Sequence, residues 1–266
     1  MGFLDVQEVS HIYFLKQSRT PALLDISLSI EEGEFVSILG PSGCGKTTLL
    51  SIIAGIIKPT MGTVRLENEL ISIEDKKTGY MLQQDYLFPW KTIEENILLG
   101  LKLTGQLNEE TKKRTLNLLP KMGLYSVEKQ YPSQLSGGMR QRVALVRTLA
   151  TDPKLLLLDE PFSALDFQTK LKLEDLVFQT LKQFHKTAVL VTHDIGEAIA
   201  MSDRVFLLSN GPGTIHRIFD IPEPLKSLTP FEARNHEKYN ELFHIIWKEM
   251  ESLEENNEYR RTSFEV

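Results

Sequence analysis

A glycine-rich loop between a predicted strand and a predicted helix constrains the fold of this chain more than any other feature. The loop reads Gly40-Pro41-Ser42-Gly43-Cys44-Gly45-Lys46-Thr47. The apolar residues 35–39 before it predict a short buried strand, and residues 48–57 after it predict a buried helix. In this order, glycines let backbone N–H groups approach phosphates, and the helix adds the positive end of its dipole. We therefore expect a nucleotide site in which Lys46 reaches the outer phosphates and Thr47 offers its hydroxyl to Mg²⁺.

The composition predicts one large domain, or one domain with a subdomain. Of the 266 residues, 41% are hydrophobic and 25% are charged, which is enough apolar material for a sizeable core. The net charge of -6 gives no bulk attraction to the phosphates of nucleic acid, so we expect no nucleic acid partner. The single cysteine, Cys44, excludes an internal disulfide and suits a reducing compartment.

No stretch of the sequence predicts export or a membrane crossing. The first residues have neither the basic start nor the long apolar run of a signal peptide. The most apolar stretch, residues 49–57, falls far short of the ~20 residues that cross a bilayer. We therefore expect the chain in the cytosol, with any membrane crossing supplied by another polypeptide.

Two adjacent carboxylates follow a second apolar run. Residues 155–158 are consecutive leucines and precede Asp159 and Glu160. Such a run predicts an interior strand, and open α/β sheets bind ligands at the carboxyl ends of their strands. We expect Asp159 to hold Mg²⁺ through water and Glu160 to polarise the attacking water. Alone, an acidic pair of this kind is more often a solvated turn or a helix cap, but its combination with the glycine loop favours catalysis.

A pair of glycines precedes another predicted helix, which runs to about Ala150. The stretch Leu135-Ser136-Gly137-Gly138-Met139-Arg140-Gln141 places a serine and two glycine amides at a helix start, where an anion can bind. The alternative is a serine N-cap followed by flexible glycines. One nucleotide does not need two phosphate-binding loops from one chain, so we expect residues 135–141 to have a role other than binding the nucleotide held by residues 40–47.

The remaining pattern predicts an α/β core that a helical segment interrupts. Residues 22–30 alternate as a strand with one solvated face and with Leu24 and Ile26 on the apolar face, whereas residues 187–191 predict an interior strand. Residues 93–150 show only helical periodicity. A helical stripe near the C-terminus consists of Tyr239, Leu242, Phe243, Ile246, Met250 and Leu253. We expect this stripe to pack on the chain's own domain or on a dimer partner.

In their order, these motifs resemble those of the ABC ATPase family over nearly the whole chain. The matches are the Walker A motif at residues 40–47, the signature at 135–139, the Walker B motif at 155–159, the Q-loop at Gln83, the D-loop at 163–166 and the switch histidine at His193. Each short motif is weak alone, and their order is highly specific. Met139 is a departure, because the family usually has glutamine there.

The resemblance implies an α/β fold. Its parts would be a P-loop NTPase core of the RecA-like type, an N-terminal antiparallel β subdomain and an inserted α-helical signature subdomain. The ATPase domain would span residues 1–235, with the helical subdomain at approximately 86–150. A C-terminal amphipathic helix and tail would occupy residues 236–266.

The resemblance also implies the residues of an ATP site. The catalytic residues would be Glu160, His193 and Lys46. The residues that hold Mg²⁺ would be Thr47, Gln83 and Asp159. The residues that bind ATP would be Tyr13, Gly40, Pro41, Ser42, Gly43, Cys44, Gly45, Lys46, Thr47, Thr48, Gln83, Ser136, Gly137 and Gly138. Tyr13 falls where the family places an aromatic ring against adenine, and Phe14 and His11 are nearby alternatives.

The family's arrangement implies the partners. Its signature faces the Walker A motif of another subunit, so two ATP molecules lie between two subunits arranged head to tail. One of each motif in this chain implies a homodimer. Further expected partners are transmembrane permease subunits and, indirectly, an extracytoplasmic solute-binding protein. The chain would then be a peripheral protein on the cytoplasmic face of the cell membrane.

The segment Leu87-Phe88-Pro89-Trp90 is similar to that of nitrate/sulfonate/taurine-type importer ATPases, as are residues 157–166. In such importers, apolar residues of this region receive a short helix of the membrane subunit. Burial in the core is the alternative for Phe88 and Trp90, and it is the commoner fate of an isolated aromatic pair. Other candidate functions are an exporter ATPase, a soluble ABC ATPase and a P-loop kinase. The soluble class usually carries paired domains, coiled coils or basic surfaces, and a kinase has no use for the signature element.

Overall fold

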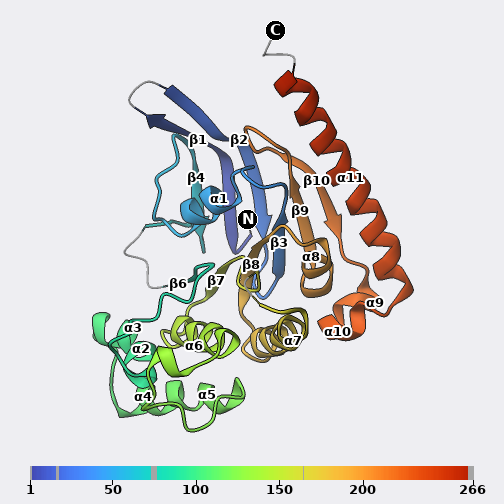
Figure 1. Ribbon diagram of the computed structural model, residues 1–266. Coiled ribbons are helices and arrows are strands. Elements are labelled where there is room, and N and C mark those ends of the chain that lie inside the picture. Colours follow the sequence, from blue (N-terminus) through green and yellow to red (C-terminus); the bar gives the residue numbers. More distant parts are fainter. Residues whose placement is uncertain (1, 16–17, 73–76, 164, 263–266) are drawn as a thin grey trace. The chain divides into compact units, whose positions relative to one another are not determined.

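The computed structural model describes residues 2–15, 18–72, 77–163 and 165–262. It divides into two compact units, each of which contains strands and helices (Figure 1). The first unit consists of Met1–Asp75 and Thr187–Val266, and the second of Lys76–Lys186. The helical segment predicted at residues 86–150 thus lies within the second unit.

An antiparallel sheet of the first unit has the strand order β2-β1-β4-β5. Its strands are β1 (Leu4–Leu15), β2 (Ser18–Ile30), β4 (Met61–Leu66) and β5 (Glu69–Leu70). The predicted antiparallel subdomain is confirmed, but the predicted alternation is wrong at its start, because Leu24 is 51% exposed whereas Leu23 is buried. Asp25 has a left-handed conformation (φ +50°) near a shift in the β1–β2 register. This bulge reverses the faces of the residues before it.

A second sheet of the first unit has the order β10-β9-β3-β8. Its strands are β3 (Phe35–Leu39), β8 (Thr187–Thr192), β9 (Arg204–Leu208) and β10 (Ile215–Asp220). Strand β3 runs parallel to β8 and β9, and β10 is antiparallel to β9. Every residue of β3 and β8 is buried, which confirms the interior strands predicted from their unbroken apolar runs.

Helix α1 (Lys46–Ile53) follows β3 and is shifted from the helix predicted at residues 48–57. Its end is a Schellman motif centred on Gly55, whose φ is +72°. The N–H groups of Gly55 and Ile56 donate to Ile52 O and Ser51 O, both at 3.0 Å. These bonds satisfy the last carbonyls of the helix, so the apolar residues beyond Gly55 do not extend it.

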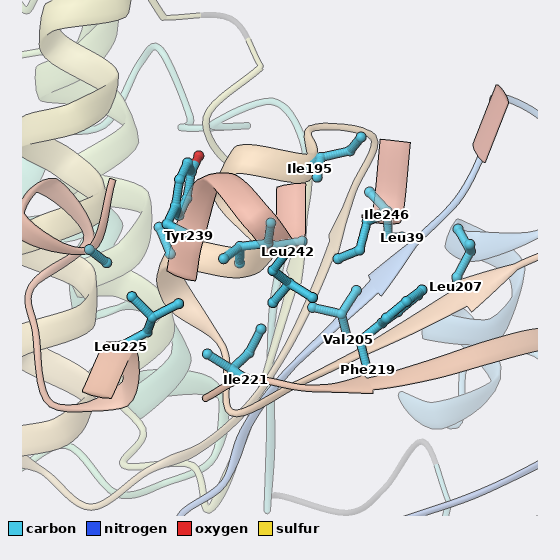
Figure 2. Packing of buried hydrophobic residues seen from close by; sticks show 14 residues of the cluster. Leu39, Ile195, Val205, Leu207, Phe219, Ile221, Leu225, Tyr239, Leu242 and Ile246 are labelled. Atoms are coloured by element: carbon cyan, nitrogen blue, oxygen red, sulfur yellow. The ribbon is translucent and has the colours of Figure 1, made fainter. Parts of the chain in front are cut away.

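The C-terminal part of the first unit is helical apart from β9 and β10. Its helices are α8 (Ile195–Met201), α9 (Glu223–Lys226), α10 (Pro230–Ala233) and α11 (Glu237–Thr262). The buried side chains of Tyr239, Leu242 and Ile246 on α11 belong to one cluster with residues of β9, β10 and α8 (Figure 2). The predicted stripe therefore packs on the chain's own domain.

The second unit pairs two parallel strands, β6 (Thr78–Met81) and β7 (Leu155–Asp159), and is otherwise helical. Its helices are α2 (Ile93–Ile97), α3 (Leu99–Leu103), α4 (Glu109–Leu116), α5 (Leu118–Lys121), the 3-10 helix η1 (Pro132–Gln134), α6 (Gly137–Leu149) and α7 (Phe167–Gln183). All regular structure described within residues 93–150 is helical, as predicted. In the described part of the chain, every helix is too short or too polar to cross a membrane.

We expect Ile246→Ala to lower the free energy of unfolding by about 2–5 kcal/mol, because this side chain is fully buried in the cluster beneath α11. The adjacent Ile245 is 46% exposed, so Ile245→Ala should change the free energy of unfolding by less than about 0.5 kcal/mol. Urea unfolding followed by circular dichroism measures both values. Equal losses in the two variants would contradict the orientation of α11.

Candidate functional site

The glycine loop and the segment that begins with His193 both start at the same edge of the second sheet. Strands β3 and β8 are parallel neighbours, and their last residues, Leu39 and Thr192, are paired in register. The glycine loop follows β3 and His193 follows β8, so the two start side by side. They lie at the carboxyl edge of the sheet, where α/β proteins bind their ligands.

The loop between β3 and α1 combines a tight backbone with a fixed positive charge. Gly45 caps α1 at φ +99°, and a Cβ there would lie 2.7 Å from Ala22 O, so only glycine fits. The Lys46 side chain is buried, and its Nζ donates to Gly40 O at 2.7 Å and to Pro41 O at 2.9 Å. The ammonium group and the start of α1 together make this loop attractive to a phosphate.

Cys44 is a buried part of the loop and not a reactive group. Burial raises the pKa of its thiol, against the lowering effect of Lys46, so the thiol is protonated at neutral pH. Gly213 packs on the same residue, because a Cβ on Gly213 would lie 2.1 Å from Cys44 O. Gly213 also links to β2, donating from its N–H to Ala22 O at 3.0 Å. This support was missed by sequence reasoning, since nothing in the pattern around Gly213 points to the loop.

Tyr13 is attached to the first turn of α1. Its hydroxyl lies 3.2 Å from Thr48 Oγ1, within hydrogen-bonding distance. The alternative ring of His11 is buried and meets Tyr13 edge to face at 4.6 Å, so its face is not available for stacking. Phe14 is more exposed than Tyr13, and it makes its cation–π contact with Arg19. The geometry favours Tyr13, and its role against adenine stays a prediction.

His193 lies on a turn that hydrogen bonds among Thr192, Asp194 and Glu197 hold in place. The Asp194 N–H donates to Thr192 Oγ1 at 3.0 Å, and Asp194 Oδ1 accepts from the Glu197 N–H at 3.1 Å. The Thr192 hydroxyl in turn donates to the buried Glu197 carboxylate. The His193 side chain is exposed at the top of this turn, where a ligand can reach it.

In the second unit, Glu160 follows β7 in a strained conformation. Its φ is +45°, a left-handed value that costs a residue with a Cβ about 1–3 kcal/mol. The Ser163 N–H and hydroxyl both donate to Glu160 O, at 3.2 and 3.0 Å, and hold the turn. Gln83 Nε2 donates to Glu160 Oε2 at 3.3 Å. The structure therefore brings the predicted water-orienting carboxylate and the Q-loop glutamine together.

The donors predicted for Mg²⁺ fit that ion. Asp159 is buried at the end of β7, and the Tyr80 hydroxyl donates to its Oδ2 at 3.3 Å. With Gln83 of the same unit it would offer carboxylate and amide oxygens, which are among the hard ligands that Mg²⁺ prefers. No three His, Cys, Asp or Glu side chains of the described residues gather into a metal cluster. Mg²⁺ needs no such cluster, because it is usually held by one or two carboxylates together with substrate phosphates and water.

The signature residues begin α6. Ser136 is its N-cap, and the Ser136 hydroxyl accepts from the Met139 N–H at 3.3 Å. The two glycines differ in their surroundings. Gly137 is exposed, and a Cβ there would make only an ordinary contact, with Arg140 Nη2 at 4.0 Å. Gly138 is buried, and a Cβ there would lie 2.6 Å from Thr169 Cγ2 on α7. Gly137 is therefore free to meet a ligand, and Gly138 is required for packing.

Helix α6 also holds the segment that follows Gln83. Gln141 Nε2 donates to Gln83 O at 3.1 Å, and Arg140 Nε pairs with the Asp85 carboxylate at 2.9 Å. Arg147 donates to Asp85 O at 2.6 Å and to the next carbonyl at 2.8 Å. This clamp could not be foreseen from the sequence, since three polar residues on a helix usually face water. It joins the signature helix and the Q-loop into one body.

Of the predicted D-loop, Ala164 lies outside the described residues. Ser163 contacts Gln83, whose Nε2 donates to its hydroxyl at 3.3 Å. Asp166 caps α7 by accepting from the Thr169 N–H at 3.1 Å. The Thr169 hydroxyl and this backbone cap lower the pKa of Asp166.

The predicted site residues are distributed over both units. Those of the first unit are Tyr13, residues 40–48 and His193. Those of the second are Gln83, residues 136–138, Asp159 and Glu160. Within each unit, the contacts above hold these residues in place.

A model of the ABC transporter family matches residues 23–163. The chain belongs to the ABC transporter family. It is 63% identical over 254 residues to the uncharacterized ABC transporter ATP-binding protein YtlC of Bacillus subtilis (strain 168), covering 96% of this chain and 98% of that protein. It is 39% identical over 251 residues to an aliphatic sulfonates import ATP-binding protein, SsuB, of Bacillus cereus, covering 93% of this chain and 96% of that protein.

The fold resembles a solved ABC structure as well. The dimeric structure of a post-hydrolysis state of the ATP-binding cassette MJ0796, bound to ADP and Pi, superposes with a TM-score of 0.73 at 35% identity. The match covers 82% of this chain and 99% of that one. The predicted family and fold class are thus confirmed. The protein is an ATP-binding subunit of an ABC transporter and an ATPase.

We expect the two signature glycines to respond differently to alanine. Gly138→Ala should lower the free energy of unfolding by about 1–3 kcal/mol, because the new methyl group would overlap Thr169. Gly137→Ala should leave it unchanged or raise it by about 0.4–1 kcal/mol, since the site is open and alanine favours a helix. Urea unfolding measures both. A Gly138→Ala variant as stable as the parent protein would contradict the packing of α6 on α7.

Proposed function

We propose that this ABC transporter ATPase energises the uptake of a small solute, of the aliphatic sulfonate, taurine or nitrate kind, through a separate permease. The observation that carries the import proposal is the exposed Trp90 beside the Q-loop, which offers a docking surface for a membrane subunit. The relative SsuB is named for the import of aliphatic sulfonates, which supports the same proposal. The chain would work on the cytoplasmic face of the membrane.

The proposed chemistry divides between the two groups of residues. Lys46 and the amides of residues 40–48 would bind the phosphates of ATP, and Tyr13 would stack on adenine. Mg²⁺, when bound through Thr47, Gln83 and Asp159, would supply charge neutralisation at the phosphates. His193 would reach the outermost phosphate from the turn after β8.

Glu160 would orient the attacking water as a hydrogen-bond acceptor. Its strained backbone and its bond from Gln83 support this role, because strained residues held by their surroundings cluster at active sites. Gln83 lies in the segment clamped to α6, so a change at Glu160 after hydrolysis would be passed to the signature helix.

The proposed active form is a head-to-tail homodimer. Each chain offers one phosphate loop and one signature, and Gly137 in the signature is exposed, so a nucleotide bound by another chain could reach it. The similar cassette MJ0796 is dimeric in its post-hydrolysis structure, which supports this arrangement. Ser136 and Gly137 of one chain would then complete the ATP site of its partner.

We expect Glu160→Gln to keep ATP binding and to lower turnover by about 10²–10⁴-fold, because the amide is a poor acceptor for the proton of water. The variant should then trap an ATP-bound dimer that size-exclusion chromatography detects. Glu110→Gln, on the exposed side of α4, is the matched control and should keep normal turnover. Normal ATPase activity in Glu160→Gln would disprove the assigned role.

Hydrogen bonds hold the segment that carries the surface proposed for the permease. Leu87 is buried, Phe88 is half-buried, and the Phe88 and Trp90 rings lie 5.4 Å apart between their centres. The buried Asn96 holds this segment by accepting from the Phe88 N–H at 2.8 Å and donating to Phe88 O and Lys91 O, each at 3.2 Å. The Trp90 side chain is 69% exposed, so the alternative of burial in the core is wrong for it. An exposed indole on a fixed loop is typical of a binding hot spot.

We expect Trp90→Ala to weaken binding to the permease at least tenfold while basal ATPase activity and stability stay unchanged, because the ring is mostly exposed and its neighbour Phe88 is not a predicted ATP-site residue. Co-purification with the permease measures binding. Tyr125→Ala is the control, since Tyr125 is 72% exposed elsewhere in the second unit. Equal binding by the two variants would contradict the docking role of Trp90.

A further inference from the structure

A cavity of about 230 Å³ opens in the second unit at a place that none of the ABC motifs occupies. It lies among the ends of helices, lined by residues of α4 and α5, by the last residue of α6 and by the chain after α7. Typical small-molecule pockets enclose about 300–1,000 Å³, so this one suits a ligand with few atoms.

The polar side of the cavity is positively charged. Its lining includes three cationic side chains, Arg114, Lys121 and Lys186, and Asp152 is the one carboxylate among the described residues that line it. Lys186 Nζ lies 2.7 Å from Asp152 Oδ1, and Arg114 Nη1 lies 3.5 Å from Asp152 Oδ2. Two cations therefore share one carboxylate, and an anion would complete the balance of charge.

The other side of the cavity is apolar. Leu118 and Leu149 are buried beneath it, and the Phe184 ring contributes a flat wall. Lys121 Nζ lies 4.9 Å from the centre of the Phe184 ring, which holds the ammonium group near the junction of the polar and apolar sides. A ligand must therefore combine a charged head with a short hydrocarbon body.

We propose that this cavity is a binding site for a small amphipathic anion, namely a short alkyl chain that ends in a sulfonate or carboxylate. The head group would contact Lys121 and the remaining N–H groups of Arg114, whose Nη1 already pairs with Asp152 and whose Nη2 donates to Ala150 O at 3.1 Å. The alkyl chain would lie against Leu118 and Phe184. Sulfonates are the named cargo of the relative SsuB, so the transported class of compound is one source of such a ligand, and short fatty acids are the other. The site stands on its own geometry, and only the transported sulfonate as a source of the ligand rests on the import proposal.

Binding would stabilise the second unit. The ligand would join the ends of α4, α5 and α6 to the segment after α7, and a ligand that binds only the folded state raises stability by mass action. The melting temperature of the protein should therefore rise with the concentration of the ligand.

Isothermal titration calorimetry of the full chain with hexanesulfonate tests the proposal, with hexanoate, hexanol and hexylammonium as comparison ligands. We expect saturable binding of the two anions and none of the alcohol or the amine. The stronger of the two anions identifies the source of the natural ligand. No saturable binding of either anion, or equal binding of hexylammonium, would overturn the proposal.

Variants locate the site. Lys121→Gln should weaken binding of hexanesulfonate at least tenfold and reduce the rise in melting temperature at a given ligand concentration, whereas Lys113→Gln, on an exposed position of α4 outside the lining, should change neither. Circular dichroism confirms that each variant is folded. Arg114→Gln is the second variant, because it removes the other cation expected to contact the head group. Unchanged binding in both Lys121→Gln and Arg114→Gln would place the anion elsewhere and contradict the assigned site.

Discussion

The close packing of backbone around the phosphate loop is the constraint on which the rest of this structure depends. The loop leaves a fully buried strand, and its turns pass within contact distance of Ala22 and Gly213. Lys46 is held by two loop carbonyls rather than by a carboxylate, so its charge stays available at the loop. Gly213 follows the second unit in the sequence, whereas the loop and Ala22 precede it. Both parts of the first unit must therefore be folded before the loop can bind a phosphate.

In the second unit, polar side chains of α6 hold the segment that follows Gln83 through hydrogen bonds. Arg140, Gln141 and Arg147 fasten α6 to the segment after Gln83, and Asn96 fixes the next turn, which presents Trp90. The signature and the proposed permease-facing indole thus belong to one connected body. A movement of the signature would therefore be transmitted to the turn that carries Trp90, and the reverse, through these hydrogen bonds.

The order of the strands and helices could be predicted from the sequence, because it follows from local pattern, whereas the roles of the motif residues stay predictions. Unbroken apolar runs became buried strands, and the loop residues took the positions that their glycines required. Prediction failed where a single backbone conformation overrides the pattern. A bulge at Asp25 moves Leu24 to the surface, and Gly55 ends a helix within an apolar run. Contacts between distant residues, such as Gly213 with Cys44, leave no local signal at all.

In the proposed dimer, each chain contributes its phosphate loop to one ATP site and its signature to the other. Cross-linking tests this arrangement most directly. The starting protein is the Cys44→Ser variant, because Cys44 is the single cysteine of the chain. One variant carries Ser42→Cys in the phosphate loop and another carries Gly137→Cys in the signature, both at exposed positions. With Glu160→Gln and ATP present, a bismaleimide should join the two variants only when they are mixed. No ATP-dependent mixed dimer, or equal cross-linking within each variant alone, would contradict the account.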